Sequence, residues 1–258
     1  MKSIAEVKTE IEEGLLARRA RDTEDIKAYL RTFEADGRKG VADFVKKKLK
    51  NIDALERERE RLFVMSEYER EYGACELICG IDEVGRGPLA GPVMAGAVIL
   101  PRNCEILYLN DSKKLTEKKR EELCLEIKEK AVAWAVGEAS PGRIDEINIL
   151  NATYEAMRNA INALGVKPDI LLNDAVIIPE VEIRQVKIIK GDAKSVSIAA
   201  ASIVAKVTRD HYMMEMDEKY PGYGFAANKG YGSESHIAAL RRLGSAPIHR
   251  RSFIGNFV

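Results

Sequence analysis

The chain has 258 residues, and its 41 lysine and arginine residues balance its 41 aspartate and glutamate residues. This length is enough for one large core with a small appended part. The zero net charge excludes the class of nucleic-acid binders that carry a strong positive charge over the whole chain. Positive charge can still gather on one face of the protein.

Cysteine spacing and hydropathy indicate the compartment. The four cysteines form no CxxC pair, so we expect neither a disulfide framework nor a zinc site. The first eight residues turn acidic without an apolar segment, and the longest apolar run, 93–100, is too short to cross a bilayer. We therefore expect a cytoplasmic protein with no membrane partner.

Residues 1–71 are rich in charges of both signs. Their apolar residues recur at helical spacing in three stretches, 4–16, 26–33 and 41–63. This pattern predicts a small all-α accessory domain over 1–71, ahead of a main domain over 72–258. It is either a solvated helical bundle or an additional grip on the substrate, which the basic run Lys46, Lys47, Lys48 and Lys50 suggests.

From residue 72 on, short apolar runs alternate with longer helical patterns. A hairpin-like group of strands comes first, and strands then alternate with helices, which predicts an α/β fold with one mixed sheet flanked by helices. The predicted strands cover 76–84, 92–100, 104–109, 131–139, 169–174 and 183–189. The predicted helices cover 116–130, 143–164, 195–219 and 233–243.

The first of these strands ends in two adjacent acids, Asp82 and Glu83, followed by a turn with three glycines and two prolines. Arg86, between Gly85 and Gly87, is the only cation in that turn. Paired acids at the end of a buried strand are costly without a cation, and glycines let a polymer backbone approach the main chain closely. The stretch therefore indicates metal-assisted phosphodiester chemistry.

Two further acids, Asp174 and Asp192, follow later predicted strands. Ligands of open α/β sheets bind beyond the carboxyl ends of the strands. Ligation by oxygen alone favours Mg²⁺ or Mn²⁺ over zinc. Each acid also has a purely structural alternative, because Asp192 could cap the helix that starts near Ser195 and Asp174 could form an Asx turn.

Asp82 and Glu83 are neighbours on one strand, so their side chains point to opposite faces of the sheet. Asp82 is therefore the safer metal ligand. Glu83 takes part only if the strand bends at Gly85, or through its carbonyl, or from the periphery.

Several residues outside the acids are candidates for binding a nucleic acid. Lys113 and Lys114 precede one helix and Lys194 precedes another, where phosphate contacts and a solvated helix start are both compatible with the sequence. Tyr231 lies between two glycines, which presents its ring for stacking on a sugar or base. The run 249–251 reads as part of a basic rim.

Taken together and in order, these segments resemble bacterial ribonuclease HII, the type 2 ribonuclease H family, over residues 76–255. The resemblance implies the ribonuclease H fold and cleavage of RNA in RNA–DNA hybrids, including a single ribonucleotide inside duplex DNA. Such an activity serves ribonucleotide excision during DNA replication and repair. The matching segments are 80–93, 111–116, 174–175, 190–195, 199–210, 228–232 and 249–253.

The resemblance also assigns roles to residues. It implies that Asp82, Glu83, Asp174 and Asp192 are the catalytic, metal-binding acids of a two-metal mechanism that leaves a 3′-hydroxyl and a 5′-phosphate. It further implies that Gly85, Arg86 and Gly87 contact the ribonucleotide 2′-hydroxyl and its phosphates, and that Tyr231 packs on the next sugar. The sister family, ribonuclease HIII, does not carry this arginine triplet, so Arg86 favours ribonuclease HII.

Two alternatives remain from the sequence alone. One is a nuclease of the ribonuclease HIII type that needs a hybrid with several ribonucleotides. The other is a non-catalytic nucleic-acid-binding module, although clustered acids would repel phosphate unless a metal is present. In either case we expect a monomer.

Overall fold

The computed structural model describes residues 2–18 and 22–257, and their contacts divide the chain into two compact units, one ending at Arg61 and one beginning at Leu62. Each unit is described by itself. The sequence-based boundary between residues 71 and 72 stays a prediction, because independent folding of the two pieces is what would define it.

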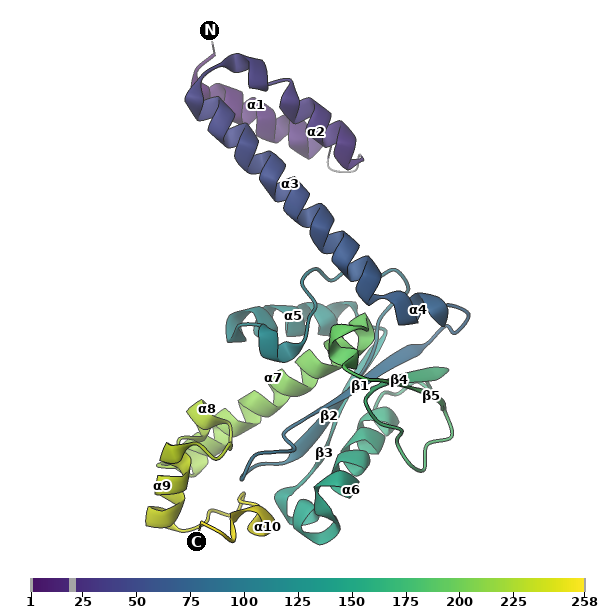
Figure 1. Cartoon of the computed structure of the whole chain (residues 1–258), viewed down its shortest axis with the longest axis vertical. Helices are drawn as coiled ribbons and strands as arrows, with labels where there is room; N and C mark the ends of the chain where they lie inside the picture. The colour runs from purple at the N-terminus through teal and green to yellow at the C-terminus, as the bar shows by residue number, and fades with distance from the viewer. Residues whose placement is uncertain (1, 19–21, 258) are drawn as a thin grey trace. The chain divides into compact units, whose positions relative to one another are not determined.

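The first unit is helical, which confirms the three helical stretches (Figure 1). The first helix begins at its predicted start because Ser3 and Glu6 form a capping box, in which each side chain accepts a hydrogen bond from the other residue's amide. Apolar residues at helical spacing form the core of this unit: Val7, Ile11, Leu30, Val41 and Val45. Its elements are α1 (Ile4–Ala17), α2 (Thr23–Arg31), the 3₁₀ helix η1 (Glu34–Asp36) and most of α3 (Lys39–Met65), whose residues from Leu62 on belong to the second unit.

The second unit contains one mixed five-stranded sheet in the order β3-β2-β1-β4-β5. Strand β1 pairs antiparallel with β2, and β2 pairs antiparallel with β3; β4 is parallel to β1, and β5 is parallel to β4. The predicted mixed sheet that starts with a hairpin-like group is therefore confirmed. Its strands are β1 (Ile78–Val84), β2 (Val93–Ile99), β3 (Ala133–Ala139), β4 (Ile170–Asp174) and β5 (Arg184–Ile188).

Helices cover both faces of this sheet (Figure 1). Helix α6 packs on β2 and β3, whereas α7 packs on β1 and β2 with α5 beside it. No helix among residues 2–18 and 22–257 is both long and apolar enough to cross a membrane. The remaining elements are α4 (Glu67–Glu71), η2 (Ser112–Lys114), α5 (Glu117–Lys130), α6 (Pro141–Asn162), η3 (Gly191–Ala193), α7 (Val196–Lys219), α8 (Phe225–Asn228), α9 (Glu234–Leu243) and α10 (Arg251–Ile254).

The predicted strand at 104–109 is wrong, because these residues form a loop between β2 and η2. Ile106 and Leu109 are 1% exposed and pack among residues of α5 and α7. Tyr108 has a φ of 71°, which an extended strand does not adopt. The apolar pattern therefore reflects burial of a loop and not sheet pairing.

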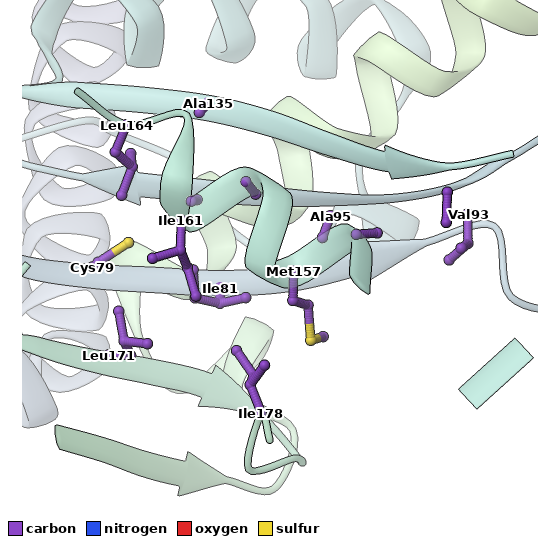
Figure 2. Packing of buried hydrophobic residues seen from close by; sticks show 14 of the residues in the cluster. Cys79, Ile81, Val93, Ala95, Ala135, Met157, Ile161, Leu164, Leu171 and Ile178 are labelled. Atoms are coloured by element: carbon purple, nitrogen blue, oxygen red, sulfur yellow. The ribbon is translucent and has the colours of Figure 1, made fainter. Parts of the chain in front are cut away.

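The core on the α6 side of the sheet is made of alternate strand residues, as Figure 2 shows for Cys79, Ile81 and Ala95 against Met157 and Ile161 of α6. On the opposite side, α7 approaches the sheet so closely that only glycine fits beneath it. A Cβ atom at Gly80 would lie 2.1 Å from the backbone of Ser197, and one at Gly96 would lie 2.3 Å from the carbonyl oxygen of Ala201. Side chains on this face of β1 therefore point at α7.

Candidate active site

Strands β1 and β4 bring two of the predicted acids to the same edge of the sheet. Their parallel register pairs Ile81 with Asn173, so the next positions, Asp82 and Asp174, lie side by side. Alternation from Gly80 places Asp82 on the face of the sheet that α7 covers. The two carboxylates therefore share one face at adjacent strand ends.

Asp82 is buried, with 5% of its surface exposed. Its Oδ1 accepts a hydrogen bond of 2.7 Å from the amide of Glu83. Burial raises the pKa of Asp82 well above its ordinary value, and the charges of Glu83 and Asp174 raise it further, although the Ser202 hydroxyl on α7 offsets part of the rise. An ionised Asp82 is thus costly here until a cation neutralises it.

Glu83 is partly buried at the next position along β1, where alternation turns it toward the other face. Burial raises the pKa of Glu83, the guanidinium of Arg86 lowers it, and Asp174 raises it. The Nη1 of Arg86 lies 3.4 Å from the Oε1 of Glu83. The Glu83 carboxylate therefore interacts with Asp174 from the periphery, and the choice between its side chain and its carbonyl as a ligand stays a prediction.

Asp192 lies in η3, between β5 and α7. The turn is tied to β4, because the amide of Gly191 donates a 2.7 Å hydrogen bond to Oδ1 of Asp174. Burial raises the pKa of Asp192, and the charges of Asp111 and Asp174 raise it further. Neither structural alternative holds: Ser195, and not Asp192, caps α7, and the bond from Gly191 to Asp174 is not an Asx turn.

The acids fit a hard divalent cation in chemistry. All four offer carboxylate oxygens, and the pKa values of Asp82, Glu83 and Asp192 are raised partly by like charges that a cation would neutralise. Within the described ranges, no three histidine, cysteine, aspartate or glutamate side chains are already close enough to form a metal site. The carboxylates would therefore have to move closer together when the cation binds.

The glycine-rich turn and Tyr231 lie next to each other. Arg86 and Gly87 are exposed, whereas Gly85 is buried with a φ of 86°. A Cβ atom at Gly87 would be 3.9 Å from Cε1 of Tyr231, whose residue surface is 46% exposed. The predicted exposure of the Tyr231 ring is confirmed, and the structure places it beside the turn.

The three candidate lysines are exposed. Lys113 lies near the acids, since its charge lowers the pKa of Asp192. Lys114 follows it in η2, and Lys194 precedes Ser195 at the start of α7. Asp111 also interacts with Asp192 but was not among the predicted site residues. In the sequence it was recognisable only as an acid in the segment before Thr116.

The predicted basic rim at 249–251 is wrong for two of its three residues. His249 is 3% exposed and Arg250 is fully buried, so only Arg251 faces solvent. The ring of His249 lies among the rings of Tyr223, Phe225 and His236, each tilted relative to it.

Glu69 on α4 supports the site from a segment that the sequence assigned to the accessory domain. Its Oε1 accepts hydrogen bonds from the Ser195 hydroxyl at 2.5 Å and from the Ser197 amide at 2.9 Å. Its other oxygen is buried without a partner among the described residues. Glu69 thus satisfies the free amide of Ser197 in the first turn of α7 and holds the hydroxyl of Ser195, three residues after Asp192.

We expect Glu69→Ala to lower the free energy of unfolding by about 1–3 kcal/mol, because two hydrogen bonds to a charged group disappear and the first turn of α7 loosens. Chemical unfolding followed by circular dichroism measures the change. Glu67→Ala on the same helix, where the side chain is exposed, is the matched control and should change stability by less than about 0.5 kcal/mol. Equal losses in the two variants would contradict the capping role.

This sheet order with helices on both faces is the ribonuclease H-like fold, and acids grouped at the ends of its central strands are typical of nucleases in that class. Comparison with known families agrees. The family model for ribonuclease HII matches residues 79–256, and the model for the ribonuclease HII N-terminal domain matches residues 3–73. The chain belongs to the ribonuclease HII family and is therefore an endoribonuclease.

Individual relatives support this membership over the whole chain. A ribonuclease HII of Lachnoclostridium phytofermentans is 64% identical over 224 residues, which cover 87% of this chain and 88% of the relative. One from Clostridioides difficile is 48% identical and covers 100% of this chain and 99% of its own. The crystal structure of ribonuclease H2 from Pyrococcus horikoshii superposes with a TM-score of 0.58 at 30% identity, over 70% of this chain and 98% of that one.

Proposed function

We propose that this chain hydrolyses the RNA strand of RNA–DNA hybrids and also cuts 5′ of a single ribonucleotide embedded in duplex DNA, leaving a 3′-hydroxyl and a 5′-phosphate. The observation that carries the proposal is the grouping of Asp82, Asp174 and Asp192 at the edge of the sheet that also ends in the Gly85–Gly87 turn. The acids supply the chemistry, and the turn supplies recognition of the nucleic acid.

In this proposal, Asp82, Glu83, Asp174 and Asp192 hold the metal. Bound Mg²⁺ or Mn²⁺ would supply water activation and neutralise the charge that develops on the leaving oxygen, as in two-metal hydrolysis. Asp82 is buried and interacts with both Glu83 and Asp174, so its carboxylate would hold the metal together with theirs. Asp174 also holds η3 in place through Gly191, which fixes the backbone next to Asp192.

The turn would distinguish RNA from DNA without reading the base. The amides of Arg86 and Gly87 lie on an exposed backbone segment and can meet a 2′-hydroxyl, the group that differs between the two nucleic acids. The Arg86 guanidinium can contact a flanking phosphate, and such contacts carry no sequence information. We therefore expect little dependence of cleavage on base sequence.

Cleavage mapping tests the proposal directly. We expect duplex DNA with one ribonucleotide to be cut only 5′ of that position, only with Mg²⁺ or Mn²⁺, and a long RNA–DNA hybrid to be cut as well. Cutting of the hybrid alone would favour a nuclease of the ribonuclease HIII type. Binding of both substrates without any cleavage would favour a non-catalytic module.

Tyr231→Ala should lower kcat/KM on the single-ribonucleotide duplex by roughly tenfold, since stacking of a nucleotide on an aromatic ring is worth about 1–3 kcal/mol. The loss on a long hybrid should be smaller, because many neighbouring ribonucleotides offer alternative registers. Tyr108, which is also 46% exposed, provides the control variant Tyr108→Ala. Equal losses on both substrates would argue against stacking.

We also infer that the N-terminal helices add contacts to the substrate and that the protein works as a monomer in the cytoplasm. Lys46, Lys47 and Lys50 are exposed on α3, whereas Lys48 is paired with Glu12. The three exposed lysines are therefore the ones available to a phosphate backbone.

A further inference from the structure

Two arginines in the second unit are fully buried, and each directs its guanidinium at backbone carbonyls. Arg209 belongs to α7, and Arg250 immediately precedes α10. Among residues 2–18 and 22–257, neither forms a salt bridge with an acidic side chain. A buried cation without an anionic partner is costly, so the carbonyls that surround these two groups must compensate for the lost hydration.

The buried guanidinium of Arg250 donates hydrogen bonds to the backbone of the glycine turn, residues 85–92. Its Nη2 donates to the carbonyl oxygen of Gly85 at 2.5 Å, its Nη1 to that of Arg86 at 2.9 Å and its Nε to that of Gly91 at 2.9 Å. The amide of Arg250 also donates to the carbonyl oxygen of Leu89 at 2.9 Å. One residue far along the chain therefore satisfies four carbonyls of the turn.

These hydrogen bonds determine the direction in which the amides of the turn point. A trans peptide unit is planar, so its N–H and C=O groups point in opposite directions. Because the carbonyls of Gly85 and Arg86 point inward to Arg250, the amides of Arg86 and Gly87 point away from it, toward the exposed side. Within the part of the chain that the structure describes, neither amide donates a hydrogen bond.

Arg209 connects the glycine turn to the Tyr231 turn, residues 229–232. Its Nη2 donates to the carbonyl oxygen of Ala90 at 3.0 Å and its Nε to that of Pro92 at 3.0 Å, while its Nη1 reaches that of Lys229 at 2.9 Å. The amide of Leu89 donates to the carbonyl oxygen of Gly230 at 2.8 Å. The two turns are thus joined both directly and through Arg209.

The space around Arg209 is filled to contact. A Cβ atom at Gly85 would lie 2.2 Å from its Nε, and one at Gly91 would lie 3.1 Å from its Nη2. Both glycines have a φ of 86°. The glycines of the turn therefore serve close packing on this guanidinium as well as the approach of a substrate.

We propose that Arg209 and Arg250 are positioning residues for substrate recognition: Arg250 orients the amides of Arg86 and Gly87 toward the 2′-hydroxyl of a ribonucleotide, and Arg209 sets the spacing between these amides and Tyr231. This inference rests on the proposed function, because it takes the glycine turn as the element that reads the sugar. The planar, five-donor guanidinium is required, since the ammonium of lysine cannot reach three carbonyls in this fork geometry.

Burial and, to a smaller extent, the charge of the neighbouring Arg209 lower the pKa of Arg250 to about 9. Burial likewise lowers the pKa of Arg209. A value near 9 leaves Arg250 charged at neutral pH, so the charge-assisted hydrogen bonds to the turn persist under the conditions of the assay.

The test measures discrimination of the sugar, which loss of folded protein alone does not change. Binding is measured by fluorescence anisotropy, in Ca²⁺ to keep the substrate intact, for a duplex with one ribonucleotide and for the same duplex in all-deoxy form. The ratio of the two Kd values reports recognition of the 2′-hydroxyl, because a reduced active fraction affects both equally. We expect Arg250→Lys to bring this ratio about tenfold closer to one, the size of one or two hydrogen bonds.

Ile161→Ala, on the face of α6 that packs against the sheet, is the control for a loss of stability without a change in the turn, and its ratio of Kd values should equal that of the wild type. Arg209→Lys should reduce the benefit of the Tyr231 ring, so that Tyr231→Ala costs less affinity in this background than in the wild type. The proposal would be overturned if Arg250→Lys left the ratio of the two Kd values unchanged and if the losses of binding free energy in Arg209→Lys and Tyr231→Ala were fully additive.

Hydrogen exchange of the wild-type protein provides a measurement that needs no variant to fold. The amides of Arg86 and Gly87 should exchange quickly in the free protein and slow down on addition of the single-ribonucleotide duplex, but not of the all-deoxy duplex. Equal protection by both duplexes would refute the orienting role. A wild-type protein that does not cut the single-ribonucleotide duplex would instead refute the proposed function, and this inference would fall with it.

Discussion

Asp82→Asn is expected to reduce metal-dependent cleavage by roughly a thousandfold or more, the scale seen when a preorganised charge is removed from an active site. Asparagine keeps the size of the side chain but replaces an anionic oxygen that would bind the metal with a neutral amide group. The same change should stabilise the metal-free protein by about 1–2 kcal/mol, as often happens when an active-site residue is held at the expense of stability. The combination of lost activity and gained stability distinguishes a functional acid from a structural one.

The pH dependence of this stability has a definite sign. Burial and the neighbouring acids raise the pKa of Asp82 in the folded protein, so the unfolded chain releases its proton first as pH increases. The penalty is absent below the pKa of the unfolded chain and grows as pH rises toward the folded value. With a chelator present, the advantage of Asp82→Asn over the wild type should therefore be small near pH 4 and larger at pH 7.5, measured by chemical unfolding.

Asp145 on α6 offers a matched control with the opposite sign. Burial raises its pKa, but hydrogen bonds from Ser252 and Arg251 outweigh this effect, and the net shift is downward. Asp145→Asn should therefore destabilise the protein at neutral pH and leave catalysis nearly intact. A destabilised Asp82→Asn, or one with full activity, would mean that the acid belongs to the scaffold.

Local sequence patterns predicted most of the fold because each main element has its own clear period. Strands β1 to β4 are short, mainly apolar runs, β5 carries the apolar residues Val186 and Ile188 at period-two spacing, and the long helices carry buried residues at helical spacing. The one wrong strand, 104–109, has the same apolar character as a strand. What separates the two is whether a partner strand is available, and that depends on residues far away in the sequence.

The positions of the candidate acids were predictable because Asp82 and Glu83 lie at the end of β1, Asp174 ends β4 and Asp192 follows β5, and parallel neighbours bring their carboxyl ends to one edge of the sheet. The buried arginines were not. A run such as His249-Arg250-Arg251 reads as exposed, since charged residues seldom lose all contact with water. Arg250 does so because it binds carbonyls of residues 85, 86 and 91, a pairing over more than 150 positions that no local pattern reveals.

Helix α7 did contain a signal. Ser195, Ser202 and Arg209 recur every seven residues, so they lie near one face of the helix, and all three are buried in a mainly apolar segment. Ser195 binds Glu69, Ser202 contacts Asp82, and Arg209 holds the two turns. A polar stripe on a buried helix indicates polar partners on the neighbouring elements, which here are Glu69 on α4, Asp82 on the sheet and the two turns.

Arg86→Ala is expected to lower kcat/KM on a single-ribonucleotide duplex by roughly a hundredfold, since it would remove the charge-assisted phosphate contact of the proposed function and also removes the cation next to Glu83. Arg86→Lys should recover only part of the loss, because lysine keeps the charge but not the two-pronged geometry. Arg102→Ala, on an exposed loop after β2, is the control and should stay near wild-type activity.

The effect of Arg86 on Glu83 and its contact with phosphate can be told apart by the pH dependence and the salt dependence of cleavage. The guanidinium lowers the pKa of Glu83, so its removal should move the acid limb of the pH–rate profile to higher pH. The phosphate contact instead weakens with added salt, so the deficit of Arg86→Ala relative to wild type should shrink as ionic strength rises. An unchanged acid limb together with a salt-independent deficit would show that Arg86 acts on neither Glu83 nor phosphate, and the loss would then come from a distorted turn.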